Sequence, residues 1–154
     1  MRKETTAQTW VEVDIGILWE ALAKDLWLIL PKVIPNLVKY SCWKGTVDLG
    51  LILVYCKTEV TNAAFQKEKI VELDENEYRF GLEVIQGGHL NHGFTYYATT
   101  FKLSTEIGVK KQTLVDITIT YDTEREEIDM PLQTAKSAST FMKALETYLL
   151  TVSI

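Results

Sequence analysis

Hydrophobic and polar residues alternate along most of this chain, which is the pattern of strands with one buried face. The alternating segments lie at 3–13, 37–43, 50–56, 64–72, 78–86, 94–103 and 112–121. Turn sequences rich in glycine, aspartate and asparagine separate the later segments, among them KGTVDLG, LDENE and QGGHLNHG. Consecutive strands with short connections predict an antiparallel meander.

Two other segments place their apolar residues three and four positions apart, as in a helix. The first begins at Asp14, a possible N-cap, and its apolar positions are Ile15, Leu18, Trp19 and Leu22. Pro31 and Pro35 then limit any second helix to one or two turns. The chain ends in a long predicted helix, whose apolar stripe consists of Ala138, Phe141, Met142, Leu145, Tyr148, Leu149 and Val152.

A long helix with one apolar stripe needs a sheet face to cover. A strongly curved antiparallel sheet around the C-terminal helix meets this need, and that shape leaves room for a cavity between the two layers. At 154 residues the chain fits a single domain, 1–154, which buries roughly 70% of its unfolded surface. The sequence therefore predicts an α+β fold with an internal cavity.

Charged residues indicate which face of each later strand is buried. Lys102 and Asp116, for example, assign their own faces of 94–103 and 112–121 to the solvent. The residues predicted to face inward are Val115, Ile117, Ile119 and Tyr121 on one strand, Tyr78, Phe80, Leu82 and Val84 on another, and Tyr97, Thr99, Phe101 and Leu103 on a third.

The strand at 64–72 has no such clear division, so the cost of burial decides. One face would bury Lys67 and Lys69, two ammonium groups side by side. The other face buries Gln66 and Glu68, and a carboxyl group can protonate or find a donor. The second arrangement costs less, so Gln66 and Glu68 are predicted to face the interior. They form either a satisfied structural network or a pair that orients a ligand in an apolar cavity.

Composition excludes several classes of function. The net charge is −5, and no basic run is interleaved with aromatic residues, which argues against a nucleic-acid partner. The longest apolar stretch, Leu26 to Leu30, is too short to span a bilayer. No apolar segment follows the basic amino terminus, so we expect no signal peptide and a cytoplasmic location.

The two cysteines, Cys42 and Cys56, lie on neighbouring predicted strands. They either approach each other across a hairpin or remain as two reduced thiols, and a cytosolic location favours the thiols. Together with His89 and His92 they show no zinc spacing. We predict no metal site and no cofactor.

Several stretches resemble the birch-pollen-allergen family, the pathogenesis-related class-ten proteins of plants. These are PKVIPNLVK at 31–39, FQKEKIVELDE at 65–75, GLEVIQGGHLNHGFTYYATTFKLS at 81–104, LVDITITYD at 114–122, and SAST and LETYLL in the last helix. Within the family they are most similar to the cytokinin-specific, or phytohormone-binding, proteins. The resemblance implies a helix-grip fold: a seven-stranded curved antiparallel sheet around a long C-terminal helix, with two short helices and an internal cavity.

The resemblance also implies a ligand site. In that subgroup a Gln and a Glu bind the polar groups of adenine-type cytokinins or of gibberellins, and they match Gln66 and Glu68. A threonine of the last helix matches Thr140, whereas the subgroup's tyrosine is replaced by Phe141 or Lys143, so that its hydroxyl is missing. The predicted ligand-binding residues are Gln66, Glu68, Thr140, Phe141, Tyr97, Phe101, Leu22, Leu82 and His89.

The glycine-rich loop departs from the family's pattern. The family usually has E-G-D-G-G-x-G-T there, and this chain has KGTVDLGL. Gly45 and Gly50 remain, but Val47 and Asp48 replace central glycines. Left-handed backbone conformations become costly at those two positions, so we expect a reshaped loop.

Two functions remain after these considerations. The first is a binding protein for a small lipophilic plant hormone or metabolite, acting as a monomer or weak homodimer. The alternative is a family-type enzyme of Pictet–Spengler condensation or cyclisation with Glu68 as its base. Such an enzyme is expected to carry an inward lysine on one of the last two strands, where 112–121 has none and Lys102 faces out. A phosphatase-recruiting receptor would need gate and latch loops, which LDENEY and QGGHLNHG do not match.

Overall fold

The structure is a computed structural model of residues 1–154, and it describes the chain except for Met1, 34–39, 43–48, 57–64, 88–89, 91–92, 107–110, 125–128 and 153–154. Its elements in chain order are β1 (Lys3–Val11), α1 (Ile15–Trp19), η1 (Glu20–Lys24), α2 (Leu26–Val33), β2 (Tyr40–Cys42), β3 (Ile52–Cys56), β4 (Phe65–Asp74), β5 (Arg79–Gly87), β6 (Phe94–Ser104), β7 (Thr113–Thr123) and α3 (Asp129–Val152).

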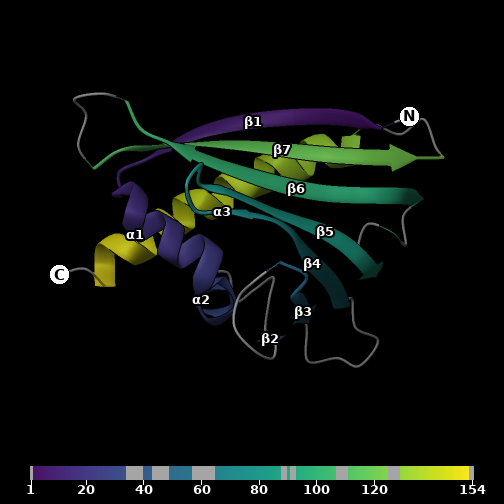
Figure 1. Ribbon diagram of the computed structural model, residues 1–154, viewed down its shortest axis with the longest axis horizontal. Coiled ribbons are helices and arrows are strands. Elements are labelled where there is room, and N and C mark those ends of the chain that lie inside the picture. Colours follow the sequence, from purple (N-terminus) through teal and green to yellow (C-terminus); the bar gives the residue numbers. More distant parts are fainter. Residues whose placement is uncertain are drawn as a thin grey trace.

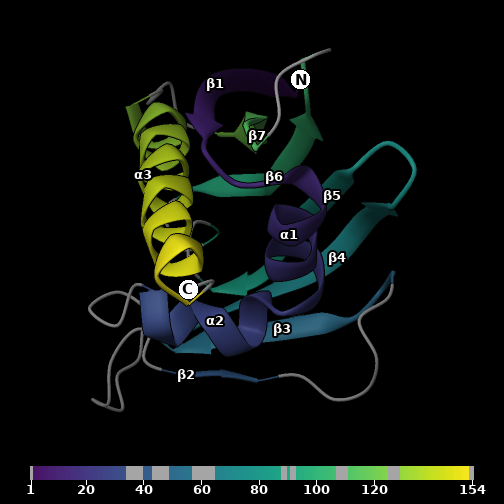
Figure 2. The ribbon, with the colours of Figure 1, turned by 90° about the vertical axis from the view of Figure 1, so that its left-hand side faces the viewer.

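The strands form one antiparallel sheet in the order β1-β7-β6-β5-β4-β3-β2 (Figure 1). Five of them are long, with nine to eleven residues, whereas β2 has three residues and β3 has five. The sheet is curved, and α3 runs along it beside β1 and β7 (Figure 2). The short helices α1 and α2 lie at one end of the curve, and α2 meets α3 there. The predicted helix-grip arrangement is thereby confirmed.

The buried core lies between the sheet and the helices, and strand alternation produces it. On β7, Val115, Ile117 and Ile119 are fully buried and Tyr121 is nearly so, as their spacing predicts. The inward residues of the next two strands are buried as well: Phe80, Leu82 and Val84 on β5, and Tyr97, Phe101 and Leu103 on β6.

Tyr78 differs from the prediction that placed it on a strand face. It lies in the turn before β5 with φ of 54°, a left-handed conformation that ends the alternation one residue early. Its half-buried ring packs edge-on against Trp19 of α1, with the ring centroids 5.6 Å apart. The turn and the first helix are therefore joined by an aromatic pair.

The first helical segment begins as predicted and then changes its winding. The Asp14 carboxylate accepts a hydrogen bond from the Gly16 N–H at 2.9 Å and so caps α1. The segment predicted as one α-helix over 14–25 instead becomes a π-helix at η1. Lys24, its last residue, forms ion pairs with Glu20 and with Glu75 of the β4–β5 turn, both at 3.1 Å. Helix α2 then includes Pro31 close to its end and stops after about two turns, as predicted.

The stripe of α3 is buried over most of its predicted length. Met142, Leu145 and Leu149 are buried, and Ala138, Phe141 and Tyr148 are half-buried against the core. Val152 is an exception, because it is 57% exposed. It is the last residue of α3 and lies beyond the last buried turn of the helix, so the prediction that it joins the core was wrong.

The glycine-rich loop is described only at its end. Gly50 has φ of 85°, a conformation that favours glycine, and its N–H donates to the Ile70 carbonyl at 2.8 Å. The loop's other positions compared above, Val47 and Asp48 among them, lie outside the described residues. The retained Gly50 therefore has a structural reason.

Candidate ligand-binding site

The orientation of β4 is fixed by its neighbours in the sheet. Glu68 pairs with Val84, and Ile70 pairs with Leu82. The three apolar residues of these pairs, Val84, Ile70 and Leu82, are all buried. Opposite residues of an antiparallel pair point to the same face. Glu68 therefore lies on the inner face of the sheet with Val84, and Gln66, two residues earlier on β4, lies on the same face. The burial argument from the sequence predicted this orientation.

Two β-bulges interrupt the pairing of β4 with β5, and the first lies between Gln66 and Glu68. Lys67 pairs with Gln86 and Glu68 with Val84, so Ile85 has no partner on β4. At the second bulge, between Ile70 and Glu72, Val71 is the unpaired residue.

Both unpaired residues are exposed, Ile85 to 38% and Val71 to 42%. Bulges bend a strand and increase its twist, and they are frequent beside functional sites. The alternation pattern did not reveal them, although each leaves a trace in the sequence: two consecutive apolar residues, Ile70–Val71 and Val84–Ile85, of which only the first is buried.

Gln66 and Glu68 interact directly. The Gln66 amide donates a hydrogen bond from Nε2 to Oε1 of Glu68, and both side chains are half-buried. This bond engages one carboxylate oxygen and one amide hydrogen. The pair still offers Glu68 Oε2, Gln66 Oε1 and the second amide hydrogen, which together can accept and donate hydrogen bonds.

Desolvation raises the pKa of Glu68 from its ordinary value of 4.5 to about 7, and the hydrogen bond from Gln66 opposes part of that shift. The side chain keeps some accessible surface and is nevertheless strongly desolvated. Near neutral pH the group is populated in both forms, so it can donate a proton as well as accept one.

The cations of β4 lie on the other face of the strand, as predicted. Lys69 is exposed and pairs across the strands with Glu83, and Lys67 is half-buried. On β6, Lys102 lies 3.9 Å from Glu77 and alternates with the buried Phe101 and Leu103. In the part of β6 and β7 that the structure describes, no lysine faces inward.

Four of the other predicted site residues belong to a tightly packed core. Leu22 and Tyr97 are fully buried, Leu82 is 5% exposed and Phe101 is 6% exposed. The Tyr97 hydroxyl donates to Thr134 Oγ1 on α3 at 2.7 Å, and desolvation raises the pKa of Tyr97 to about 12. A ligand can reach these residues only if the core opens.

The remaining predicted residues fall in three different environments. Phe141 is half-buried on α3 and packs against the core. Thr140 is exposed, and its hydroxyl donates to the Lys136 carbonyl at 3.1 Å, so α3 does not bring it together with Gln66 and Glu68. A threonine hydroxyl in a helix commonly donates to the carbonyl one turn earlier. The sequence spacing could not distinguish a threonine that bonds in this way from one that points to the interior. His89 lies outside the described residues.

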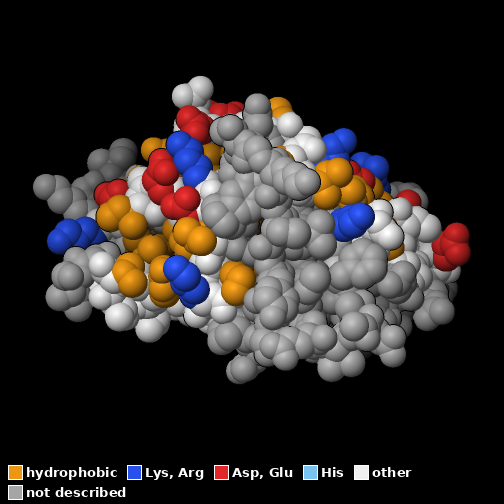
Figure 3. Space-filling view, turned by 90° about the horizontal axis from the view of Figure 1, so that it is seen from below, with side chains coloured by type: hydrophobic (Ala, Val, Ile, Leu, Met, Phe, Trp, Pro, Cys, Tyr) orange, Lys and Arg blue, Asp and Glu red, His pale blue; other side chains and the backbone are white. Residues whose placement is uncertain are grey.

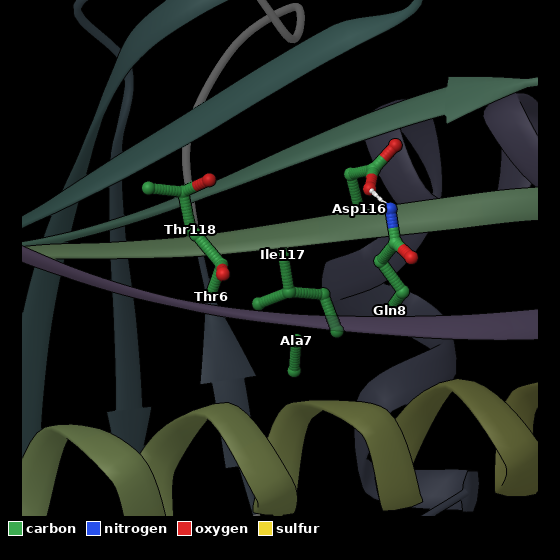
Figure 4. A pocket seen from close by; sticks show the side chains of 6 residues that line it. All are labelled: Thr6, Ala7, Gln8, Asp116, Ile117 and Thr118. Atoms are coloured by element: carbon green, nitrogen blue, oxygen red, sulfur yellow. Dashed lines mark hydrogen bonds between the residues drawn. The ribbon is translucent and has the colours of Figure 1, made fainter.

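A hollow of about 490 Å³ lies on the opposite, outer face of the sheet, over β1 and β7. In Figure 4, Thr6 and Thr118 form one side and the hydrogen-bonded pair Gln8–Asp116 forms the other. Ala7 and Ile117, between them, point away towards α3. The hollow is thus the gap between two rows of outward side chains. It is separated from Glu68 by β6 and β5, so it is not part of the candidate site.

The surface chemistry agrees with the composition. Among the side chains coloured by type on the face seen from below in Figure 3, Lys and Arg are interspersed with Asp, Glu and hydrophobic residues. Among the described residues, no group of three or more His, Cys, Asp or Glu side chains is placed to hold a metal ion. None of the helices, over the residues that the structure describes, is long and apolar enough to cross a membrane.

Residues 36–152 match the model of the pathogenesis-related protein Bet v 1 family. The chain belongs to this family. Its fold is also that of two solved structures of low sequence identity. One is norcoclaurine synthase from Thalictrum flavum in complex with dopamine and hydroxybenzaldehyde. The two sequences are 21% identical, the superposition covers 97% of this chain and 87% of that chain, and the TM-score is 0.80. The other is the major latex-like protein 151 of Panax ginseng. Here the identity is 18%, the superposition covers 96% of this chain and 97% of that chain, and the TM-score is 0.81.

The family resemblance derived from the sequence is thereby confirmed. At such identities the two solved structures establish the fold and no activity. The fold is shared by an enzyme and by other proteins, so it does not decide between the two functions considered above. That choice depends on the residues of this chain.

Proposed function

We propose that this protein binds a small lipophilic plant hormone or metabolite, of the cytokinin or gibberellin kind, between the inner face of the sheet and α3. The observation that carries the proposal is the hydrogen-bonded pair Gln66–Glu68 on the inner face of the sheet, where the nearby Ile70, Leu82 and Val84 are buried apolar residues. A small number of polar groups within an apolar surface is the usual arrangement of a small-molecule site.

The chemistry of the pair selects the ligand's polar groups. With Glu68 ionised, its Oε2 and the Gln66 Oε1 both accept hydrogen bonds, so a ligand with two neighbouring N–H or O–H groups is favoured. Adenine-type rings carry N–H donors beside ring acceptors, and gibberellins carry hydroxyl and carboxyl groups. The subgroup's tyrosine is replaced by Phe141 or Lys143, which removes one hydroxyl donor from α3, so we expect a ligand preference within these classes that differs from that of the subgroup.

Catalysis is the second candidate, because a glutamate with a pKa near 7 is suited to act as a general base. Against it stands the absence of an inward lysine on the described parts of β6 and β7. A single carboxylate supports proton abstraction, whereas activating a carbonyl or protonating a leaving group requires a second group. We therefore favour binding without turnover.

Calorimetry with a panel of cytokinins, gibberellins and related metabolites tests the proposal. For the tightest ligand, Glu68→Gln should weaken binding by about 1–3 kcal/mol, or roughly five- to 150-fold in Kd. Glu83→Gln on the outer face of β5 is the matched control and should bind as the wild type does. Equal affinities for the wild type and both variants would place the ligand elsewhere.

Mass spectrometry of the same mixtures separates the two functions. A binding protein returns the ligand unchanged after prolonged incubation. A new mass that forms with wild type and not with Glu68→Gln would establish the enzyme instead.

A further inference from the structure

Strand β1 forms one edge of the sheet, with β7 as its single neighbour. Its register with β7 is continuous from Lys3 to Val11, without the bulges that interrupt β4 and β5. The backbone groups of β1 that point away from β7 therefore have no strand to pair with.

Side chains of α3 cover one end of this edge. Lys143 Nζ donates to the Trp10 carbonyl, and the Glu12 N–H donates to the Glu146 carboxylate. Lys143 and Glu146 also form an ion pair at 3.6 Å. Helix α3 thus supplies hydrogen-bond partners at the end of β1, where the chain turns into α1.

These contacts also show which residues face the open edge. In a strand the N–H and C=O of one residue point to the same side, and successive residues alternate between the two sides. Since the Trp10 carbonyl points away from β7, the backbone groups of Glu4, Thr6 and Gln8 point the same way. Among the residues that the structure describes, no side chain of α3 hydrogen-bonds to the stretch from Lys3 to Thr9, which is the open part of the edge.

The open stretch has few of the features that prevent strands from pairing. It contains no proline and no bulge, and Lys3 at its end is its only cation. Three threonines give it a high β-propensity. An edge of this length and regularity is a template for another strand.

We propose that β1 pairs with β1 of a second copy of this chain, antiparallel and about a twofold axis, so that the two sheets become continuous. Overlap of the whole stretch from Lys3 to Thr9 places the axis at Thr6. Thr6 then exchanges both backbone hydrogen bonds with Thr6 of the second copy, and Glu4 exchanges both with the second copy's Gln8.

The side chains agree with this register. Glu4 lies opposite Gln8 of the second copy, whose side-chain amide can donate a hydrogen bond to the Glu4 carboxylate. Lys3 lies opposite Thr9 of the second copy, so no like charges meet across the axis. Each copy carries a net charge of −5, which opposes association at long range. The dimer is therefore weak, and added salt should strengthen it by screening that repulsion.

Sedimentation equilibrium of the whole protein, from micromolar to millimolar concentration, tests the proposal with two matched variants. Thr6→Lys places two ammonium groups opposite each other at the axis and should weaken the dimer about fivefold or more. Thr118→Lys adds the same charge on the same face of the neighbouring strand, away from the axis, and should leave the dimer constant unchanged.

A cross-linking variant tests the register independently of any effect on folding. In a hydrogen-bonded antiparallel pair the Cα atoms are about 5.5 Å apart, within reach of a disulfide. Thr6→Cys should therefore form a dimer under mild oxidation. Gln8→Cys, whose equivalents lie roughly 13 Å apart along the strands, should not exceed the background that wild type sets through Cys42 and Cys56.

Either of two results would overturn the proposal. The first is a monomer over the whole concentration range at high salt. The second is a dimer that Thr6→Lys and Thr118→Lys affect equally. Cross-linking of Gln8→Cys as readily as Thr6→Cys would overturn the register.

Discussion

The two sides of the sheet differ in how they fill the space against the helices. On the β6–β7 side, Tyr97, Ile117 and Ile119 have no exposed surface. On the β4 side, Gln66 and Glu68 remain half-buried near the buried Ile70, and a bulge falls between the two polar residues. The first side resembles the core of any globular protein. The second places polar groups where packing alone would place apolar ones.

The difference assigns separate tasks to the two sides. Complete apolar burial on β6 and β7 stabilises the fold. A desolvated carboxyl group on β4 costs stability, and the ligand site proposed above would account for its presence there. The predictions below test this division, beginning with the largest expected effect.

The packed side should behave as a core under truncation. Phe101 is 6% exposed, so Phe101→Ala should lower the free energy of unfolding by about 3–5 kcal/mol. Ile85→Ala, at an exposed bulge position on β5, should change it by less than about 0.5 kcal/mol. Urea denaturation measures both. A small loss for Phe101→Ala would mean that a cavity already borders this residue and that the ligand site extends to β6.

The polar side should make stability depend on pH. The pKa of Glu68 is raised from 4.5 to about 7 in the folded protein, so below pH 4.5 both states are protonated. As the pH rises towards 7, the unfolded chain ionises first, and folding loses up to about 3 kcal/mol from this group. Above about pH 7 the loss is complete.

The measurement is urea denaturation from pH 4 to pH 8 for wild type and Glu68→Gln. Subtracting the two curves removes the contribution of the other carboxyl groups. The difference should grow from pH 4.5 to pH 7 and then remain constant. A difference independent of pH would show that Glu68 is solvated in the folded protein and that its pKa is not raised.

The contact between the packed side and α3 should have a smaller, local effect. Tyr97→Phe removes the hydroxyl that donates to Thr134 at 2.7 Å and leaves the ring in place. The expected loss is about 1 kcal/mol in the free energy of unfolding. Thr134→Val should lower the free energy of unfolding by a similar amount. The double variant should lose less than the sum of the two single losses, because each single change already removes the same Tyr97–Thr134 bond. Additive losses would show that the bond contributes nothing.

The sequence could predict the packed side well and the polar side only in part. Alternation of Val115, Ile117 and Ile119 determines their burial, because a strand with one apolar face has one way to bury it. Relative costs also predicted the orientation of Glu68 correctly. The bulges at Val71 and Ile85, the π-helical turn and the outward hydroxyl of Thr140 depend on local backbone geometry, which a period of two or 3.6 does not encode.

The smallest expected signal is the release of protons on ligand binding. It connects the protonation of Glu68 with its proposed role in binding. A ligand that presents N–H or O–H donors should bind the ionised carboxylate preferentially. At pH 7, where the pKa of about 7 leaves half of the free protein protonated, binding should release about half a proton and should weaken as the pH falls below 7. Calorimetry in two buffers of different ionisation enthalpy measures this release.

Glu83→Gln should show the same release as the wild type, and Glu68→Gln should show none. If Glu68→Gln released as many protons as the wild type, another group would titrate on binding, and the orienting role would pass from Glu68 to that group.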